Sequence, residues 1–155
     1  MKINEEKIIV RSDINLGVTI AYEDKKQKRP LVLLIAGTGS LNRDGNGLGL
    51  KTNLYKDLSD MFVEMGFVCI RYDKRGTHES KTKNMNFGLT DLTNDASTII
   101  RNTKNLDFVD NEKVVVCGHS EGAMIATLLT QKENLRGIIL LGGACMSIKD
   151  ALLYQ

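Results

Sequence analysis

The sequence predicts an α/β fold in which an N-terminal hairpin is followed by a mostly parallel sheet with helices on both faces. Three observations support this class. Apolar runs of strand length recur along the chain, segments with helical spacing separate them, and no internal repeat or low-complexity linker interrupts the alternation. Strands that alternate with helices form a parallel sheet with right-handed crossovers. A chain of 155 residues has the length of one such domain, so we expect residues 1–155 to form a single domain.

The first two elements are predicted to pair as an antiparallel hairpin. Residues 7–11 and 18–22 are rich in β-branched residues, and Asp13 and Gly17 between them favour a turn. Residues 31–36, Leu-Val-Leu-Leu-Ile-Ala, form the next run and show no alternation of apolar with polar residues. Such a run is typical of a parallel strand that is covered on both faces.

A long loop and a helix follow this strand. Residues 37–51 are rich in glycine and polar residues, and a loop of about a dozen residues suggests function by its length alone. Thr52 or Asn53 can cap a helix that runs through Met65, and a strand is expected at 67–72. We expect the inner face of this helix to carry Leu54, Leu58, Met61, Phe62 and Met65.

The remaining chain repeats the alternation. A polar segment at 73–88 leaves the strand at 67–72, and helices then alternate with strands. The expected elements are a helix from Thr90 or Asp91 to about Leu106, a turn at 107–113, a strand from Val114, a helix from Glu121 to about Gln131, a strand at 137–141 and a further helix at 147–154.

The strand from Val114 runs directly into Gly118-His119-Ser120-Glu121-Gly122. A serine at a strand-to-helix junction between two such glycines indicates a nucleophile elbow, with Ser120 as the candidate catalytic nucleophile. The tight turn forces the serine into a strained backbone conformation, and strand and helix pass too close for side chains at Gly118 and Gly122. The alternative is an ordinary strand-to-helix connection in which Ser120 caps the helix.

Candidate oxyanion donors accompany this serine. Ligands of open α/β sheets bind beyond the carboxyl ends of the strands, where Ser120 would present its hydroxyl. A tetrahedral intermediate needs N–H donors for its oxyanion, and the backbone amide of Glu121 at the helix N-terminus supplies one. The second is expected from the loop after the first parallel strand, at the Thr38 amide, which Gly37 and Gly39 keep reachable.

These features resemble the α/β-hydrolase superfamily, in particular bacterial serine esterases and serine aminopeptidase-like hydrolases. The resemblance rests on residues 118–122, on the loop at 37–46, and on residues 72–80, Tyr-Asp-Lys-Arg-Gly-Thr-His-Glu-Ser, which are similar to the family's Tyr-Asp-x-Arg-Gly-x-Gly-x-Ser. The resemblance implies serine hydrolysis of an ester, thioester or amide in a small-molecule acyl substrate, with no cofactor and no metal. Two positions depart from the family pattern, since Ala36 replaces a histidine and His78 replaces a glycine.

The general base is missing from the expected place. A serine at neutral pH needs an adjacent base, and the superfamily order is serine, then acid, then histidine. The chain has only His78 and His119, and neither follows Ser120. We expect the His119 side chain to point away from the serine. His78 is expected to be a surface turn residue, the alternative being a substitute base, and Asp150 is expected to be a surface acid.

This absence predicts that residues 1–155 are the N-terminal portion of a hydrolase, without the cap, the triad acid and the triad histidine, and inactive alone. The strand at 137–141 would then be an uncovered apolar edge, which invites self-association with another chain. The alternative function is a non-catalytic α/β binding or interaction module. A third candidate function is nucleotide or phosphate binding by residues 37–47, and only the glycines of this segment favour it. A dinucleotide-binding fingerprint would require its third glycine at position 42, where this chain has Asn42.

Composition limits the partners and the compartment. The net charge of +2 implies no strong field for nucleic acid or an anionic membrane, so neither is expected as a partner. Cys69, Cys117 and Cys145 lie in or beside apolar segments and are expected to be buried thiols, which fits a reducing compartment. The first residues carry acids and no signal peptide, and no run is long enough to span a bilayer. We therefore expect a cytoplasmic location.

Overall fold

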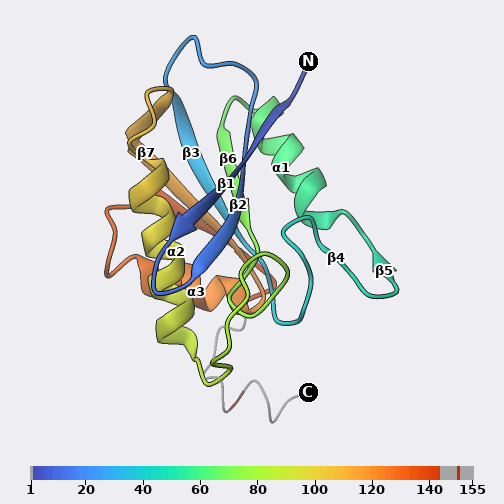
Figure 1. Cartoon of the computed structure of the whole chain (residues 1–155). Coiled ribbons are helices and arrows are strands. Elements are labelled where there is room, and N and C mark those ends of the chain that lie inside the picture. The colour runs from blue at the N-terminus through green and yellow to red at the C-terminus, as the bar shows by residue number, and fades with distance from the viewer. Residues whose placement is uncertain (1, 144–149, 151–155) are drawn as a thin grey trace.

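The computed structural model describes residues 2–143 and residue 150. These residues form one six-stranded sheet, a small two-stranded sheet and three helices (Figure 1). The elements in chain order are β1 (Asn4–Arg11), β2 (Asn15–Tyr22), β3 (Arg29–Ile35), β4 (Asn46–Gly47), β5 (Leu50–Lys51), α1 (Leu54–Glu64), β6 (Val68–Tyr72), α2 (Leu89–Thr103), β7 (Val109–His119), α3 (Glu121–Leu129) and β8 (Gly137–Leu141).

The large sheet has the strand order β1-β2-β6-β3-β7-β8. β1 pairs antiparallel with β2, from Asn4 opposite Tyr22 to Arg11 opposite Asn15, and β2 pairs antiparallel with β6. The pairs β6–β3, β3–β7 and β7–β8 are all parallel. The prediction of a hairpin followed by a mostly parallel sheet is therefore confirmed.

Helices cover both faces of this sheet. α2 and α3 lie on one face, where Ile99, Ile100 and Ile125 are buried in the larger core, and α1 packs Phe62 and Val63 into a second core on the opposite face (Figure 1). β3 contributes side chains to both cores and is buried from Leu31 to Ile35. Its run of apolar residues without alternation is therefore explained by coverage on both faces.

α1 turns a different face inward from the predicted one. Its buried residues include Tyr55 and Ser59, whereas Leu54, Met61 and Met65 are exposed. The prediction of an inner face with Leu54, Met61 and Met65 is therefore wrong. Polar side chains occupy the interior because they have partners there: the Ser59 hydroxyl accepts a hydrogen bond from the Arg71 guanidinium at 3.2 Å.

The N-terminus of α1 is capped by backbone from the preceding loop. Asn53 has a left-handed conformation with φ 53° and makes no side-chain capping bond, so of the two predicted caps Asn53 is wrong. The other candidate, Thr52, accepts a hydrogen bond from the Leu54 amide at its side-chain oxygen, at 3.3 Å. The carbonyl oxygen of Asp44 also accepts hydrogen bonds from the amides of Tyr55 and Lys56, at 3.2 and 3.3 Å. The loop at 37–51 thus folds back over the start of α1, and β4 and β5 form a small hairpin within it.

The remaining boundaries shift by a few residues from those expected. β7 begins at Val109, inside the predicted turn at 107–113, because Pro30 pairs with Asp110 while the next residue, Leu31, pairs with Val114. The intervening polar residues form a bulge within one continuous strand. α2 ends at Thr103 and α3 at Leu129, slightly before the expected ends. The helix predicted at 147–154 lies outside the described residues, apart from residue 150.

Three further expectations concern the cysteines, membrane-spanning helices and the edge strand β8. Cys69 and Cys117 are buried and free, and burial raises the pKa of their thiols to about 12 and about 11. Cys145 lies outside the described residues. No helix within residues 2–143 has the length and apolar character needed to cross a membrane. β8 is an edge strand with Ile139 and Leu140 37% and 48% exposed; self-association through this edge stays a prediction.

Candidate active site

The Ser120 turn (residues 118–122) joins β7 directly to α3. Ser120 has backbone angles of φ 53° and ψ −116°, which lie outside the regions that residues with a side chain favour. Holding a residue in such a conformation costs about 1–3 kcal/mol. The Ser120 amide donates a hydrogen bond to the carbonyl of Leu141 in β8 at 2.8 Å, and the Ser120 carbonyl accepts one from Ala123 at 3.0 Å. The surrounding backbone therefore holds the serine in place against this strain.

The glycines of the turn are required by close backbone approach. A Cβ atom at Gly118 would lie 2.1 Å from the carbonyl oxygen of Gly122, and a Cβ atom at Gly122 would lie 2.3 Å from the carbonyl oxygen of Ile35. Both distances are far shorter than van der Waals contact, so a side chain at either position would force α3 away from the sheet. Glycine at positions 118 and 122 lets the helix start directly against β3 and β7.

The side chain of Ser120 is exposed and has no hydrogen-bond partner among residues 2–143. In particular, its hydroxyl makes no capping bond to the first turn of α3. Ser120 is thus the N-cap residue of α3 without capping the helix through its side chain. The hydroxyl is free to contact a bound molecule.

Both candidate oxyanion donors lie beside this turn. Gly37, the first residue after Ala36 at the end of β3, approaches it so closely that a Cβ atom on Gly37 would lie 3.2 Å from the Ser120 Cβ atom. Thr38 and Glu121 line one cavity of about 250 Å³, which we call the small cavity. In the part of the chain that the structure describes, neither of their amides donates a hydrogen bond. Two residues that line the small cavity, one of them the neighbour of Ser120, thus have backbone amides without a hydrogen-bond acceptor among the described residues.

The lining of the small cavity combines apolar and charged residues. Its apolar residues are Met85, Phe87 and Leu92. Among its charged residues, the buried ammonium of Lys74 forms an ion pair with the carboxylate of Glu121. The cavity can therefore hold a group that is mainly apolar and that ends in a polar atom near the two amides.

A second ion-pair group supports the same wall. The Arg75 guanidinium forms two hydrogen bonds with the buried carboxylate of Asp95, at 2.8 and 2.7 Å, and two with Asp13 in the β1–β2 turn, at 2.8 and 2.5 Å. The pairing with Arg75 lowers the pKa of Asp13 to about 2, because the hydrogen bonds favour the charged carboxylate. Burial has the opposite effect on Asp95, whose pKa is raised above its ordinary value. These contacts fix the 73–80 segment against α2.

A family model for serine aminopeptidase, S33, matches residues 45–153, more than half of the chain. The chain belongs to the serine aminopeptidase S33 family. The matched residues include the 73–80 segment and the Ser120 turn, whereas Gly37 and Thr38 precede them. No curated protein sequence matches this S33-family chain.

Solved structures identify the fold of this S33-family chain as that of the α/β hydrolases. The α/β hydrolase GrgF from Penicillium sp. sh18 superposes with a TM-score of 0.73 at 15% identity over 92% of this chain and 46% of that one. Est1E from Butyrivibrio proteoclasticus, solved with ferulic acid bound, gives 0.74 at 22% identity over 94% and 56%. A putative dienelactone hydrolase from Klebsiella pneumoniae gives 0.75 at 11% identity over 95% and 62%. The chain spans about half the length of the structures it resembles.

Neither histidine of the S33-family chain bonds to the Ser120 hydroxyl. The His119 ring nitrogen Nδ1 lies 2.9 Å from the hydroxyl oxygen of Tyr55, and its ring packs against the tyrosine ring. His78 has φ 38°, and its Nε2 lies 3.1 Å from the carbonyl oxygen of Ser40. No base for the serine is thus found among residues 2–143, and the described Cys, His, Asp and Glu side chains do not gather into a group that could hold a metal ion.

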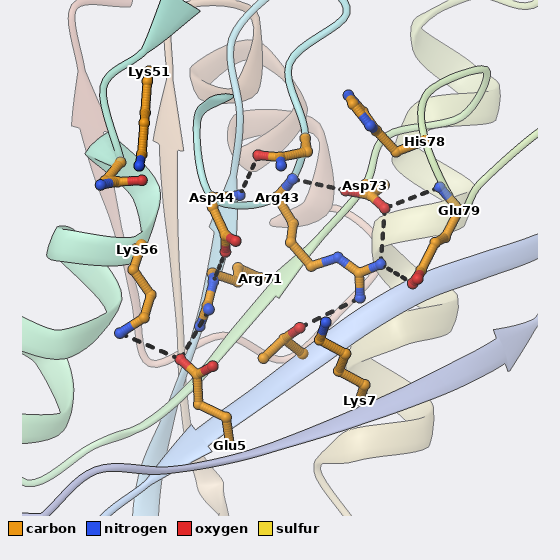
Figure 2. Close-up of a pocket in the computed structure, with 13 residues that line it drawn as sticks. Glu5, Lys7, Arg43, Asp44, Lys51, Lys56, Arg71, Asp73, His78 and Glu79 are labelled. Atoms are coloured by element: carbon orange, nitrogen blue, oxygen red, sulfur yellow. Dashed lines mark hydrogen bonds and ion pairs between the residues drawn. The ribbon is translucent and has the colours of Figure 1, made fainter. Parts of the chain in front are cut away.

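A larger cavity, of about 520 Å³, lies between β1, the loop at 42–44 and α1, and we call it the large cavity (Figure 2). The residues that line it are all charged or polar, and Figure 2 shows Arg43 and Arg71 among them. Arg43 pairs with Asp73 at 2.8 Å and also with Glu79. Arg71 pairs with Asp44 at 2.7 Å and with Glu5 at 2.9 Å. His78 lines this cavity and not the small one.

Two features of the site are visible only in the structure. Tyr55 joins the Gly37 amide to His119, and Lys74 pairs with Glu121. A tyrosine in the first turn of an otherwise amphipathic helix carries no recognisable signal. The Lys74–Glu121 pair had a weak signal, since each residue lies at the carboxyl end of a predicted parallel strand.

Proposed function

We propose that the protein is a serine hydrolase that cleaves an ester, thioester or amide bond of a small-molecule acyl substrate. The observation that carries this proposal is the Ser120 side chain: it is exposed, it bonds to no described residue, and its backbone is held in a strained turn between β7 and α3. Strain of this kind persists where the surroundings over-determine it, and it clusters at functional sites.

The proposed chemistry is attack of the Ser120 oxygen on the substrate carbonyl carbon. The carbonyl π bond breaks as the new C–O bond forms, and the amides of Thr38 and Glu121 donate to the resulting oxyanion. Their support comes from the close approach of Gly37 to Ser120 and from the unused N–H groups at the small cavity. The general base takes the proton of the Ser120 hydroxyl. The oxyanion then collapses and breaks the bond to the leaving alcohol, thiol or amine, which departs with that proton, and water hydrolyses the acyl–Ser120 ester to the free acid and restores the Ser120 hydroxyl.

The proposed reaction also needs a general base and an acid that orients it. We propose that the base and its acid come from parts of that fold that residues 1–155 do not contain, so that these residues alone are inactive. The support is the absence of a base for Ser120 among residues 2–143 and the coverage of about half of the related structures.

We assign the small cavity to the acyl group of the substrate. A volume of about 250 Å³ with Met85, Phe87 and Leu92 on one side suits a short aliphatic or a single-ring aromatic acyl group. Est1E, whose structure holds ferulic acid, is a relative of the same fold that supports testing aromatic acyl esters. Thioesters and amides with the same acyl groups complete the substrate panel.

A fluorophosphonate probe applied to the complete protein tests the proposal. We expect one labelled residue, Ser120, identified by mass spectrometry of peptides, and no label on Ser120→Ala. The control is Ser12→Ala, in the exposed β1–β2 turn, which is expected to keep the label. An unlabelled wild-type protein, or a label on another serine, would overturn the assignment.

The second candidate is a non-catalytic binding or interaction module, which the missing base favours. Residues 1–155 would then remain unlabelled even when joined to any further natural sequence.

We also propose a cytoplasmic location, supported by the free buried thiols of Cys69 and Cys117. We propose further that β8 pairs with another chain. Ile139→Lys should then reduce a concentration-dependent increase in apparent mass, measured by light scattering.

A further inference from the structure

The hydroxyl of Tyr55 lies between two segments that meet at Ser120. Tyr55 is in the first turn of α1 and only 3% exposed. The Gly37 amide donates a hydrogen bond to its oxygen at 2.9 Å, and His119 Nδ1 lies 2.9 Å from the same oxygen. One hydroxyl therefore links the residue before Thr38 to the residue before Ser120.

The direction of the first hydrogen bond is fixed, because a backbone N–H can only donate and the Tyr55 oxygen therefore accepts from Gly37. The hydroxyl proton of Tyr55 has no other acceptor among residues 2–143, and a buried donor is rarely left without a partner. We therefore infer that Tyr55 donates to His119 Nδ1 and that the imidazole carries its proton on Nε2. Burial raises the pKa of the Tyr55 hydroxyl above its ordinary value, so this group keeps its proton at neutral pH.

This link acts where the backbone has little other support. Gly37 has no side chain, and a Cβ atom placed on it would lie 3.2 Å from the Ser120 Cβ atom. Glycine has more conformational freedom than any other residue, so an unrestrained Gly37 would let the Thr38 amide turn away from the small cavity. The bond to Tyr55 removes part of this freedom at the residue immediately before Thr38.

The large cavity supports the tyrosine from the other side. Asp44, whose carbonyl caps the first turn of α1, is held through its carboxylate by Arg71 at 2.7 Å (Figure 2). Arg71 is itself buried and also bonds to Glu5 and Ser59. The ion pairs of the large cavity therefore fix the start of the helix that carries Tyr55.

We propose that Tyr55 is a positioning residue that holds the Gly37–Thr38 backbone beside Ser120, through one hydroxyl shared between the Gly37 amide and His119. The proposal rests on the proposed function, because its consequence is the orientation of an oxyanion donor. The residue touches no substrate and acts only through Gly37 and His119.

The first test is Tyr55→Phe in the complete protein, with Tyr22→Phe as the matched control. Tyr22 also donates its hydroxyl proton, to Glu6, but lies on the hairpin away from the Ser120 turn. We expect the rate of fluorophosphonate labelling at Ser120 to fall about tenfold in Tyr55→Phe, less than the loss of a whole oxyanion donor. Tyr22→Phe should label at the wild-type rate. Rates are measured well below the unfolding temperature of each variant.

The second test uses His119. His119→Leu removes the acceptor and should slow labelling, whereas His119→Asn presents an oxygen near the position of Nδ1 and should restore most of the rate. Because the two side chains form one link, Tyr55→Phe combined with His119→Leu should be little slower than the slower single variant. Nitrogen-15 NMR of the imidazole should show Nδ1 as the unprotonated nitrogen in the wild type, and a loss of this preference in Tyr55→Phe.

The outcomes separate the two proposals. A labelled wild type with an unaffected Tyr55→Phe rate overturns the positioning role and leaves the serine hydrolase proposal intact. An unlabelled wild type overturns both. Additive effects of Tyr55→Phe and His119→Leu, or an Nδ1-protonated His119 in the wild type, contradict the shared hydroxyl. If Tyr55→Phe does not fold, the labelling rates of His119→Leu and His119→Asn test the positioning role instead.

Discussion

The large cavity and the small cavity differ in the pairing of their arginines and backbone amides. The large cavity has the greater volume, but its arginines are saturated by Asp44, Asp73 and nearby glutamates. The small cavity has about half that volume, and its lining includes Glu121, the residue after Ser120, whose hydroxyl has no partner among the described residues. The comparison teaches that unpaired donors and backbone strain mark a reactive site better than size does.

The two regions are also held in place by different interactions. Around the large cavity, buried charges and their partners fix the loop at 37–51 to the sheet. Around Ser120, close packing of glycine backbones holds one residue in an unfavourable conformation. The four predictions below test this contrast in order of decreasing effect.

The largest effect is expected for Gly122→Ala. The new Cβ atom would lie 2.3 Å from the Ile35 carbonyl oxygen, so α3 must move, and the free energy of unfolding should fall by more than about 3 kcal/mol. Denaturation in urea measures this loss. Gly137→Ala is the control, since a Cβ atom there has open space around it. Similar losses in both variants would show that the turn is not tightly packed.

Arg71→Met tests the large cavity. This substitution leaves the carboxylates of Asp44 and Glu5 without their buried partner, and should lower the free energy of unfolding by about 2–3 kcal/mol, since both acids keep some contact with water. Lys51→Met, in the same cavity wall and exposed, should change it by less than about 0.5 kcal/mol. Equal values would mean that the ion pairs do not support the fold.

Ser120→Gly should stabilise the protein while abolishing the label. Glycine adopts a positive φ without the steric cost of a Cβ atom, so the free energy of unfolding should rise by about 1 kcal/mol. Ser120→Ala loses the same hydroxyl but keeps the Cβ atom, and its stability should remain near that of the wild type. If both variants have the same stability, the turn stores no strain.

The smallest effect concerns pH. The pKa of Asp13 is about 2 in the folded protein, below its ordinary value, so its pairing with Arg75 contributes stability above pH 4 and loses it as the pH falls toward 2. Asp13→Asn should remove about 0.5 kcal/mol of this pH dependence, a small value because the side chain is 67% exposed. Urea unfolding at pH 2 and pH 5 measures it. Asp107→Asn is an exposed control, and an equal change there would contradict the assignment.

Local chemistry made the sheet and the Ser120 turn predictable. The uninterrupted apolar run of β3 and the Gly-x-Ser-x-Gly spacing each record a constraint from immediate neighbours, and such constraints can be read from short stretches of sequence. The start of β7 was missed because Asn111, Glu112 and Lys113 have the composition of a turn, although they form a bulge whose existence depends on pairing with β3.

The supporting shell could not be predicted for the same reason. Tyr55 and Ser59 are buried on α1 because their partners, Gly37 and Arg71, come from other segments of the chain. The arginines of the large cavity likewise find carboxylates from β1 and from two loops. The burial of a polar residue can be predicted only when the segments that supply its partners are known to lie beside it. That arrangement cannot be read from one sequence.

The contact between Gly118 and Gly122 distinguishes residues that the fold requires from the residue that the proposed reaction requires. These glycines are demanded by the distance between helix and strand, whatever the serine does. A related protein that lost the reaction would therefore be free to change Ser120 and would still have to retain both glycines. In related sequences, the glycine pair then indicates that the fold is shared, and the residue at the position of Ser120 indicates whether the reaction is retained.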